Sequence, residues 1–234
     1  MDPLQQELDR LLGTLSDAGQ IHSRLESLVS VYPFNEYEFI ISHLLARDVL
    51  SLDQYLELRV NYIARNRYRS LFELGPTALG TTWAEEHLLK LVFGLKKAKT
   101  GKHDLLLDDV RVEVKTSRAV DKKSKKPLVQ KALLSDSSRP FLMNFQQTKA
   151  EHFDVIVWIG IWLDSIRYWV LAATEVETHR RFSGKQHRGN IGEGQLHVTN
   201  KNINDFDGFD AQPNKLAEAI REAYKRQRAA INSG

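Results

Sequence analysis

A stretch near the middle of the chain alternates apolar and charged side chains, which predicts two short strands joined by a tight turn. If Asp108 and Asp109 form that turn, the numbers of paired residues add to a constant, and Asp104 lies directly opposite Glu113. Lys115 then falls on the same face as the two carboxylates. The other face carries only leucine and valine and is expected to contact the core: Leu105, Leu107, Val110, Val112 and Val114.

Carboxylates that face each other across a strand pair repel, because their Cβ atoms are only about 5 Å apart. A divalent cation between them removes this repulsion. Oxygen ligands suit Mg²⁺, which takes one or two carboxylates and keeps water and phosphate oxygens, and we expect Mn²⁺ to substitute for it. With the ammonium of Lys115 beside it, such a site predicts phosphodiester hydrolysis. The alternative is an edge hairpin whose charged face is simply solvated.

These residues resemble the motif of the PD-(D/E)xK nuclease superfamily, and within it of the type II restriction endonucleases. The motif is an aspartate, a hairpin-long spacer and Glu-x-Lys, here Asp104 and then Glu113, Val114 and Lys115. The proline that often precedes the aspartate is His103 here. The resemblance implies that Asp104, Glu113 and the carbonyl of Val114 hold the metal ion. It also implies that Lys115 orients or deprotonates the attacking water.

Families of this kind also carry a glutamate on a helix before the hairpin. Here Thr81 or Thr82 is expected to begin a helix that runs to about Lys97 and offers two candidates, Glu85 and Glu86. Glu85 borders the apolar stripe of this helix, whereas Glu86 lies about 100° further round it. We therefore expect Glu85 to assist catalysis. For either residue the alternative is an ordinary first-turn acid that is favourable to the helix dipole.

Basic residues are concentrated around the hairpin. Residues 96–131 contain twelve Lys or Arg and five Asp or Glu, whereas residues 1–60 contain four basic and ten acidic residues. A basic block around a metal site suits a polyanion, so we expect double-stranded DNA as the partner. The expected DNA contacts lie in two polar stretches, for each of which a solvated loop is the alternative: Lys122, Lys123, Lys125 and Lys126, and then Lys185, His187, Arg188 and Asn190.

The hydrophobic pattern predicts an α/β fold with a central mixed β-sheet flanked by helices, like that of restriction endonucleases. Residues 1–74 are expected to form an N-terminal helical subdomain that supports the fold or packs against a second subunit, and residues 75–234 the nuclease domain. Residues 153–163 are apolar on both faces, as in a central strand. We expect a helix over residues 141–151 and another that Pro213 begins.

Several other classes of protein are disfavoured. The chain contains no cysteine, which excludes disulfides and thiolate zinc sites. No apolar run approaches the roughly 18 residues that span a membrane, and the first residues lack a secretory signal pattern. These features favour a cytoplasmic protein, and the resemblance to restriction endonucleases implies a prokaryotic one. The histidines lack zinc-hydrolase spacing, and no serine-nucleophile elbow is present.

The resemblance implies a Mg²⁺-dependent, sequence-specific endonuclease of double-stranded DNA, a type II restriction enzyme that leaves 5′-phosphates. A palindromic target would require a homodimer. A restriction enzyme would also be paired functionally with a DNA methyltransferase. Two alternatives remain open: a structure-specific repair or phage nuclease of the same fold, and a non-catalytic DNA-binding protein.

Overall fold

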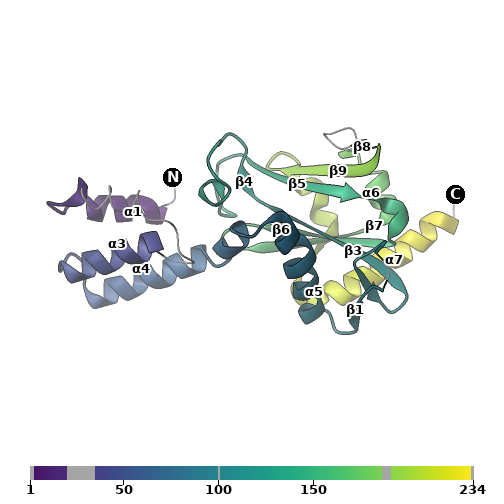
Figure 1. Cartoon of the computed structure of the whole chain (residues 1–234), viewed down its shortest axis with the longest axis horizontal. Coiled ribbons are helices and arrows are strands. Elements are labelled where there is room, and N and C mark those ends of the chain that lie inside the picture. The colour runs from purple at the N-terminus through teal and green to yellow at the C-terminus, as the bar shows by residue number, and fades with distance from the viewer. Residues whose placement is uncertain (1–2, 20–34, 100, 186–190, 233–234) are drawn as a thin grey trace.

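The computed structural model describes residues 3–19, 35–99, 101–185 and 191–232, which form two β-sheets with helices against one of them (Figure 1). No helix within these ranges is both long enough and apolar enough to cross a membrane.

The N-terminal part is helical, as the sequence predicts, and lies to one side of the sheets (Figure 1). Its helices are α1 (Pro3–Leu12), α3 (Asn35–Ala46) and α4 (Leu52–Arg65). Ser51 begins α4 with a capping box, since its side chain accepts from the backbone N–H of Gln54 and the Gln54 side chain accepts from the backbone of Ser51. These helices share a small core of their own, which includes Leu12, Ile41, Leu44 and Tyr62. The domain boundary at residue 74 stays a prediction.

The larger sheet has six strands, and the parallel pairing of β3 with β6 makes it mixed. In spatial order they are β1 (Leu95–Lys97), β2 (Leu105–Leu107), β3 (Val110–Arg118), β6 (Val155–Ile161), β7 (Ile166–Ala172) and β10 (Asp210–Ala211). Every residue of β6 is buried, which confirms the prediction of a central strand.

The second sheet covers one face of the first through an aromatic core that includes Phe145, Trp158, Trp169 and Phe206. In spatial order its strands are β4 (Val120–Asp121), β5 (Phe141–Thr148), β9 (Ile191–Thr199) and β8 (Phe182–Lys185). The helix predicted over residues 141–151 is therefore wrong. Phe141, Met143 and Phe145 are buried at every second position, which is the period of a strand.

Helices cover the other face of the larger sheet (Figure 1). A π-helical segment, η2 (Ala78–Ala84), continues directly into α5 (Glu85–Leu91), and α7 (Leu216–Asn232) follows the short 3₁₀ helix η6 (Pro213–Lys215). The helix expected from Thr81 or Thr82 to about Lys97 is therefore wrong at both ends. Helical structure already includes Ala78, so neither threonine begins it. It ends at Leu91, and Gly94, at φ +87°, then turns the chain into β1. The short helices are η1 (Arg69–Phe72), η3 (Val129–Lys131), η4 (Ala150–His152), α6 (Ala173–Glu177) and η5 (Ile203–Phe209). The α/β fold with a flanked mixed sheet is confirmed.

Candidate active site

The hairpin forms in the predicted register. Leu105 pairs with Val112 and Leu107 pairs with Val110, around a turn in which Asp108 takes a φ of +53°. All five residues of the predicted apolar face are buried. Asp104 directly precedes β2, and the same register continued by one residue places it opposite Glu113.

The site lies where β3 extends beyond the end of its pairing with β2. The pairing with β2 covers β3 only from Val110 to Val112, so the following residues present an edge on that side. Asp104 occupies part of this unpaired edge, because its Oδ2 accepts a hydrogen bond of 2.9 Å from the backbone N–H of Val114. The N–H and C=O groups of one strand residue point to the same side. The carbonyl of Val114 therefore faces the same edge as the carboxylate of Asp104.

Glu113 and Lys115 lie on the face of β3 that is turned toward the second sheet, level with Ile156 and Trp158 of β6. Glu113 is only 8% exposed, and its Oε1 accepts a hydrogen bond of 2.5 Å from Nζ of Lys115. Burial raises the pKa of the Glu113 carboxyl; the ammonium of Lys115 opposes this shift, and the charge of Asp104 adds to it. The charge of Glu85 also raises this pKa slightly, so Glu113 interacts with two other carboxylates.

Glu85 joins this group from α5. It is 8% exposed and forms an ion pair of 3.5 Å with Lys97 of β1, whereas Glu86 is exposed. Burial raises the pKa of Glu85, the charge of Asp104 raises it further, and Lys97 lowers it. These electrostatic interactions link Glu85 to the carboxylates of the hairpin, although they lie on a different element.

Lys97 was missed as a site residue, because the sequence places it at the end of a long helix. The sequence feature that could have indicated a strand here is the run Leu95-Lys96-Lys97, which follows Gly94 and contains a buried leucine and two exposed lysines. In β1 Lys97 pairs with Leu105, and this pairing brings its ammonium to Glu85.

The donor set suits an ion that needs few protein ligands. Within the part of the chain that the structure describes, no three His, Asp or Glu side chains are grouped to hold a metal. Asp104, Glu113 and the carbonyl of Val114 offer two carboxylates and one neutral oxygen on one strand edge. Mg²⁺ is bound in proteins by such small sets together with water. Burial is the main cause of the raised pKa of Glu113, and the charges of Asp104 and Glu85, which a cation would offset, add to it.

The lysines predicted to contact DNA do not lie beside the carboxylates. Lys122, Lys123, Lys125 and Lys126 are exposed in the loop after β4. From Glu113 to Arg118, β3 alone spans about 17 Å at about 3.3 Å per strand residue, and the loop lies further along the chain. Lys185 ends β8, while His187, Arg188 and Asn190 lie outside the described residues.

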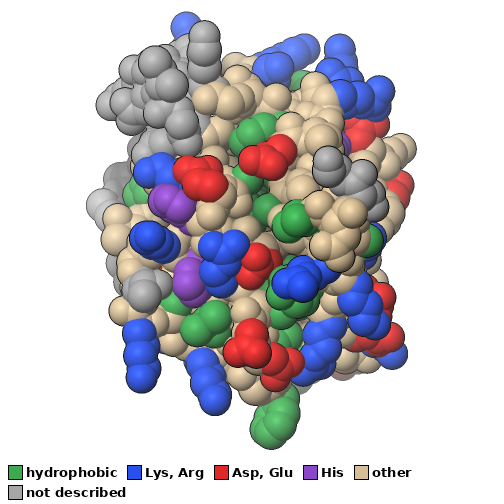
Figure 2. Space-filling model, turned by 90° about the vertical axis from the view of Figure 1, so that its right-hand side faces the viewer, with side chains coloured by type: hydrophobic (Ala, Val, Ile, Leu, Met, Phe, Trp, Pro, Cys, Tyr) green, Lys and Arg blue, Asp and Glu red, His purple; other side chains and the backbone are tan. Residues whose placement is uncertain are grey.

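Figure 2 shows the side of the molecule that lies at the right of Figure 1. Lys and Arg side chains are spread around acidic and histidine side chains there, and they do not merge into one continuous basic patch.

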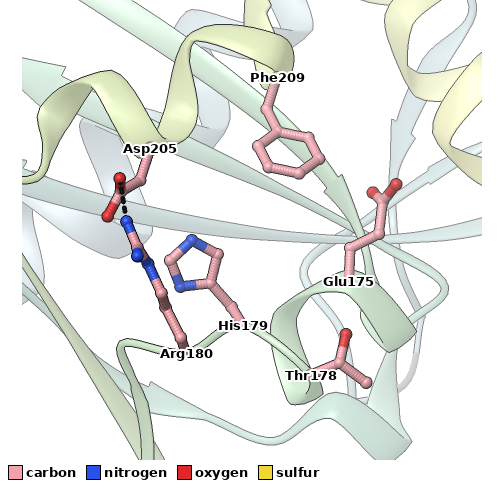
Figure 3. A pocket seen from close by; sticks show the side chains of 6 residues that line it. All are labelled: Glu175, Thr178, His179, Arg180, Asp205 and Phe209. Carbon is pink, nitrogen blue, oxygen red and sulfur yellow. Dashed lines mark hydrogen bonds and ion pairs between the residues drawn. The ribbon is translucent and has the colours of Figure 1, made fainter.

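A hollow of about 430 Å³ lies between α6 and η5 (Figure 3). Its charges are largely paired within the protein: Arg180 forms an ion pair of 2.5 Å with Asp205, and Glu175 forms one of 2.6 Å with Arg226. His179 stacks on Phe206. The hollow contains none of the predicted site residues and is lined by Glu175, Thr178, His179, Arg180, Asp205 and Phe209.

The positions of Glu85 and Glu86 yield a test of which glutamate assists the reaction. We expect Glu85→Gln to slow DNA cleavage by about a hundredfold, the lower range for loss of a positioned acid or base. Glu86→Gln should cleave like the wild type, because Glu86 is exposed. Single-turnover cleavage rates of the two variants decide this. Equal rates for both variants and the wild type would remove Glu85 from the site.

Comparisons with known proteins add little to this geometry. No protein-family model matches the chain, and no curated protein matches it. Among solved structures, a bacterial homing endonuclease, I-Ssp6803I, matches 67% of this chain and 99% of its own at 14% identity and a TM-score of 0.37. A similarity of this size carries no argument about fold or function, so the functional conclusion rests on the residues of the site.

Proposed function

We propose that this chain is a Mg²⁺-dependent endonuclease that hydrolyses phosphodiester bonds in double-stranded DNA, with Asp104, Glu113 and Lys115 in its active site. One observation carries the proposal. Two carboxylates from paired strands and a lysine that contacts one of them at 2.5 Å meet beside a strand edge whose backbone carbonyl is also available.

Each residue has a role that follows from its position. Asp104, Glu113 and the carbonyl of Val114 would hold the ion, which when bound supplies Lewis acidity and an activated water. Lys115 orients the attacking water and balances negative charge on the pentavalent phosphorus centre. Glu85 binds water on the side of the site that faces α5. Water attacks phosphorus in line, the bond to the 3′ oxygen breaks, and that oxygen takes up a proton, which leaves a 3′-hydroxyl and a 5′-phosphate.

We further propose that the enzyme acts as a type II restriction endonuclease and as a homodimer, functionally paired with a DNA methyltransferase. A palindromic site requires two active sites related by a two-fold axis. A row of apolar side chains on α4 supports pairing through the N-terminal helices, because Leu52, Leu56 and Val60 lie one turn apart and are 60%, 48% and 64% exposed.

Digestion of plasmid and phage DNA in the presence of Mg²⁺ tests the proposed specificity. We expect discrete fragments whose 5′ ends carry phosphate, since a type II restriction endonuclease cleaves at a fixed sequence. Smears or cleavage at flaps would favour the structure-specific nuclease instead. A gel shift without cleavage in either Mg²⁺ or Mn²⁺ would favour the non-catalytic DNA-binding protein.

A further inference from the structure

Phe93 lies almost entirely in solvent, in the connection between α5 and β1. Of the large apolar side chains that the structure describes, it is the most exposed, at 98%. Its ring therefore adds nothing to the core. A single exposed apolar side chain is common on protein surfaces, so the setting of Phe93 decides whether it has a partner.

A tight turn holds Phe93 in this position. The backbone N–H of Leu95 donates to the carbonyl of Val92 at 3.2 Å, and Gly94 takes a φ of +87°. A hydrogen-bonded turn with glycine at a φ near +80° in its third position has the pattern of a type II turn. Both ends of the turn are anchored in the core, since Val92 is 1% and Leu95 is 7% exposed. Phe93 is therefore presented outward from a fixed backbone.

Strand β1 connects this turn to the proposed active site. Lys97, which pairs with Glu85 at 3.5 Å, is four residues from Phe93, and four residues of extended chain span at most about 14 Å. The next residue, Ala98, donates its backbone N–H to the carbonyl of Asp104 at 3.0 Å. A duplex covers about 14 Å in about four base steps of 3.4 Å. DNA that is cleaved at the site therefore extends far enough to reach Phe93.

The chain on both sides of Phe93 carries only positive charge. Residues 88–99 contain no Asp or Glu and four lysines, all exposed: Lys90, Lys96, Lys97 and Lys99. The turn of the neighbouring hairpin is acidic, but its Asp108 pairs with Arg221 at 3.1 Å. An aromatic ring between lysines suits a partner that offers both phosphate charge and the flat faces of bases, which is DNA.

The position of β1 at the edge of the sheet offers another explanation for the lysines alone. Strand β1 is the outermost strand of the larger sheet, and lysines on an edge strand prevent it from pairing with a strand of another protein. That role does not explain Phe93, because an exposed phenylalanine favours the association that the lysines prevent. Contact with DNA accounts for both.

We propose that this edge, residues 90–99, is a DNA-binding surface of the nuclease, on which the ring of Phe93 stacks on bases about four base pairs from the cleaved bond and the lysines contact the flanking phosphates. The inference rests on the proposed function and adds a contact to it. In a duplex, such a ring acts as a wedge that partly unstacks one base step and kinks the DNA. Because pyrimidine–purine steps kink most easily, Phe93 also contributes to sequence preference without a hydrogen bond to a base.

Phe93→Ala should bind a DNA duplex about tenfold more weakly than the wild type, within the range for loss of one aromatic stacking contact. Affinity is measured with Ca²⁺ replacing Mg²⁺ so that the DNA stays intact, and the kink by energy transfer between dyes at the two ends of the duplex. Phe93→Trp should restore both signals. All three proteins should share one thermal midpoint, because the side chain at this position is exposed. Ile231→Ala is the matched control, since Ile231 is also apolar and 60% exposed but lies near the end of α7.

Unchanged affinity and energy transfer in Phe93→Ala would overturn the inference, and the proposed function would stand if the wild type cleaves DNA. So would an equal loss in Ile231→Ala, or an unchanged salt dependence when Lys96→Ala and Lys99→Ala are combined, which should lower the slope by about two. Weaker binding by Phe93→Ala, beside a wild type that binds but never cleaves, would support the surface and end the proposed function.

Two further outcomes would overturn the inference. A wild type that binds no duplex would end both the surface and the proposed function. If Phe93→Ala keeps its affinity for DNA but no longer binds vesicles of anionic lipid that the wild type binds, the ring belongs to a membrane-binding surface instead.

Discussion

Asp104→Asn and Glu113→Gln should each abolish DNA cleavage and leave DNA binding within about tenfold of the wild type, or roughly 1.4 kcal/mol. Each variant keeps the size of the side chain but removes one of the two carboxylates of the proposed site, Asp104 at the edge of β3 and Glu113 on its face. Binding persists because phosphate contacts made elsewhere dominate affinity for DNA. Parallel cleavage and gel-shift assays check this. Normal cleavage by either variant would end the assignment of the hairpin as the active site.

Glu113→Gln should also stabilise the protein. The pKa of Glu113 is higher in the folded protein than in the unfolded chain. Protonated Glu113 therefore stabilises the folded state at a pH below its ordinary pKa, and this stabilisation is lost as the pH rises through the raised pKa. At neutral pH the neutral amide avoids the penalty of a buried charge. We therefore expect a higher thermal midpoint in an inactive enzyme. A lower midpoint would mean that the ion pair of Glu113 with Lys115 stabilises the folded protein, and that Glu113 is not kept for function at a cost in stability.

Lys115→Ala should reduce single-turnover cleavage by at least about a hundredfold, the loss typical of one group that stabilises charge in the transition state. Lys115→Arg should fail as well. The side chain of Lys115 is mostly enclosed, at 23% exposure, and contacts Glu113 at 2.5 Å. A guanidinium is larger and planar and does not fit a position made for a compact ammonium.

A simple phosphate contact at Lys115 would behave differently. Arg would then restore activity, and the alanine variant would show a weaker dependence of DNA binding on salt. Lys122→Ala is the matched control, since it removes the same charge from an exposed loop away from the carboxylates. Full cleavage by Lys115→Arg, measured beside binding titrations across salt, would reduce Lys115 to a clamp on the DNA backbone.

The parts of the site that depend on local pairing were predictable. Alternating residues with a two-residue turn determine that Asp104 faces Glu113, and helical periodicity distinguishes Glu85 from Glu86. Both follow from a few neighbouring residues, and the structure places both as expected. The apolar run over residues 153–163 likewise needed only its own composition to be recognised as a buried strand.

The parts that depend on distant pairing were not predictable. Residues 141–151 were expected to form a helix, but the core between the two sheets selects a strand by burying Phe141, Met143 and Phe145. Lys97 reaches Glu85 only because the chain reverses after Leu91. The pairing of β5 with β9 also shifts its register between Phe145 and Thr148, which no local pattern encodes.

The most direct test of the whole account is the conversion of supercoiled plasmid by the purified wild-type chain, with Mg²⁺ and with Mg²⁺ plus EDTA, beside Asp104→Asn. We expect nicked or linear DNA with Mg²⁺ alone, and supercoiled DNA with EDTA or with the variant, because Asp104 is one of the proposed ligands on the edge of β3. Conversion that persists in EDTA or in the variant would contradict the account. So would the absence of cleavage across a set of plasmid and phage DNAs that the wild type binds.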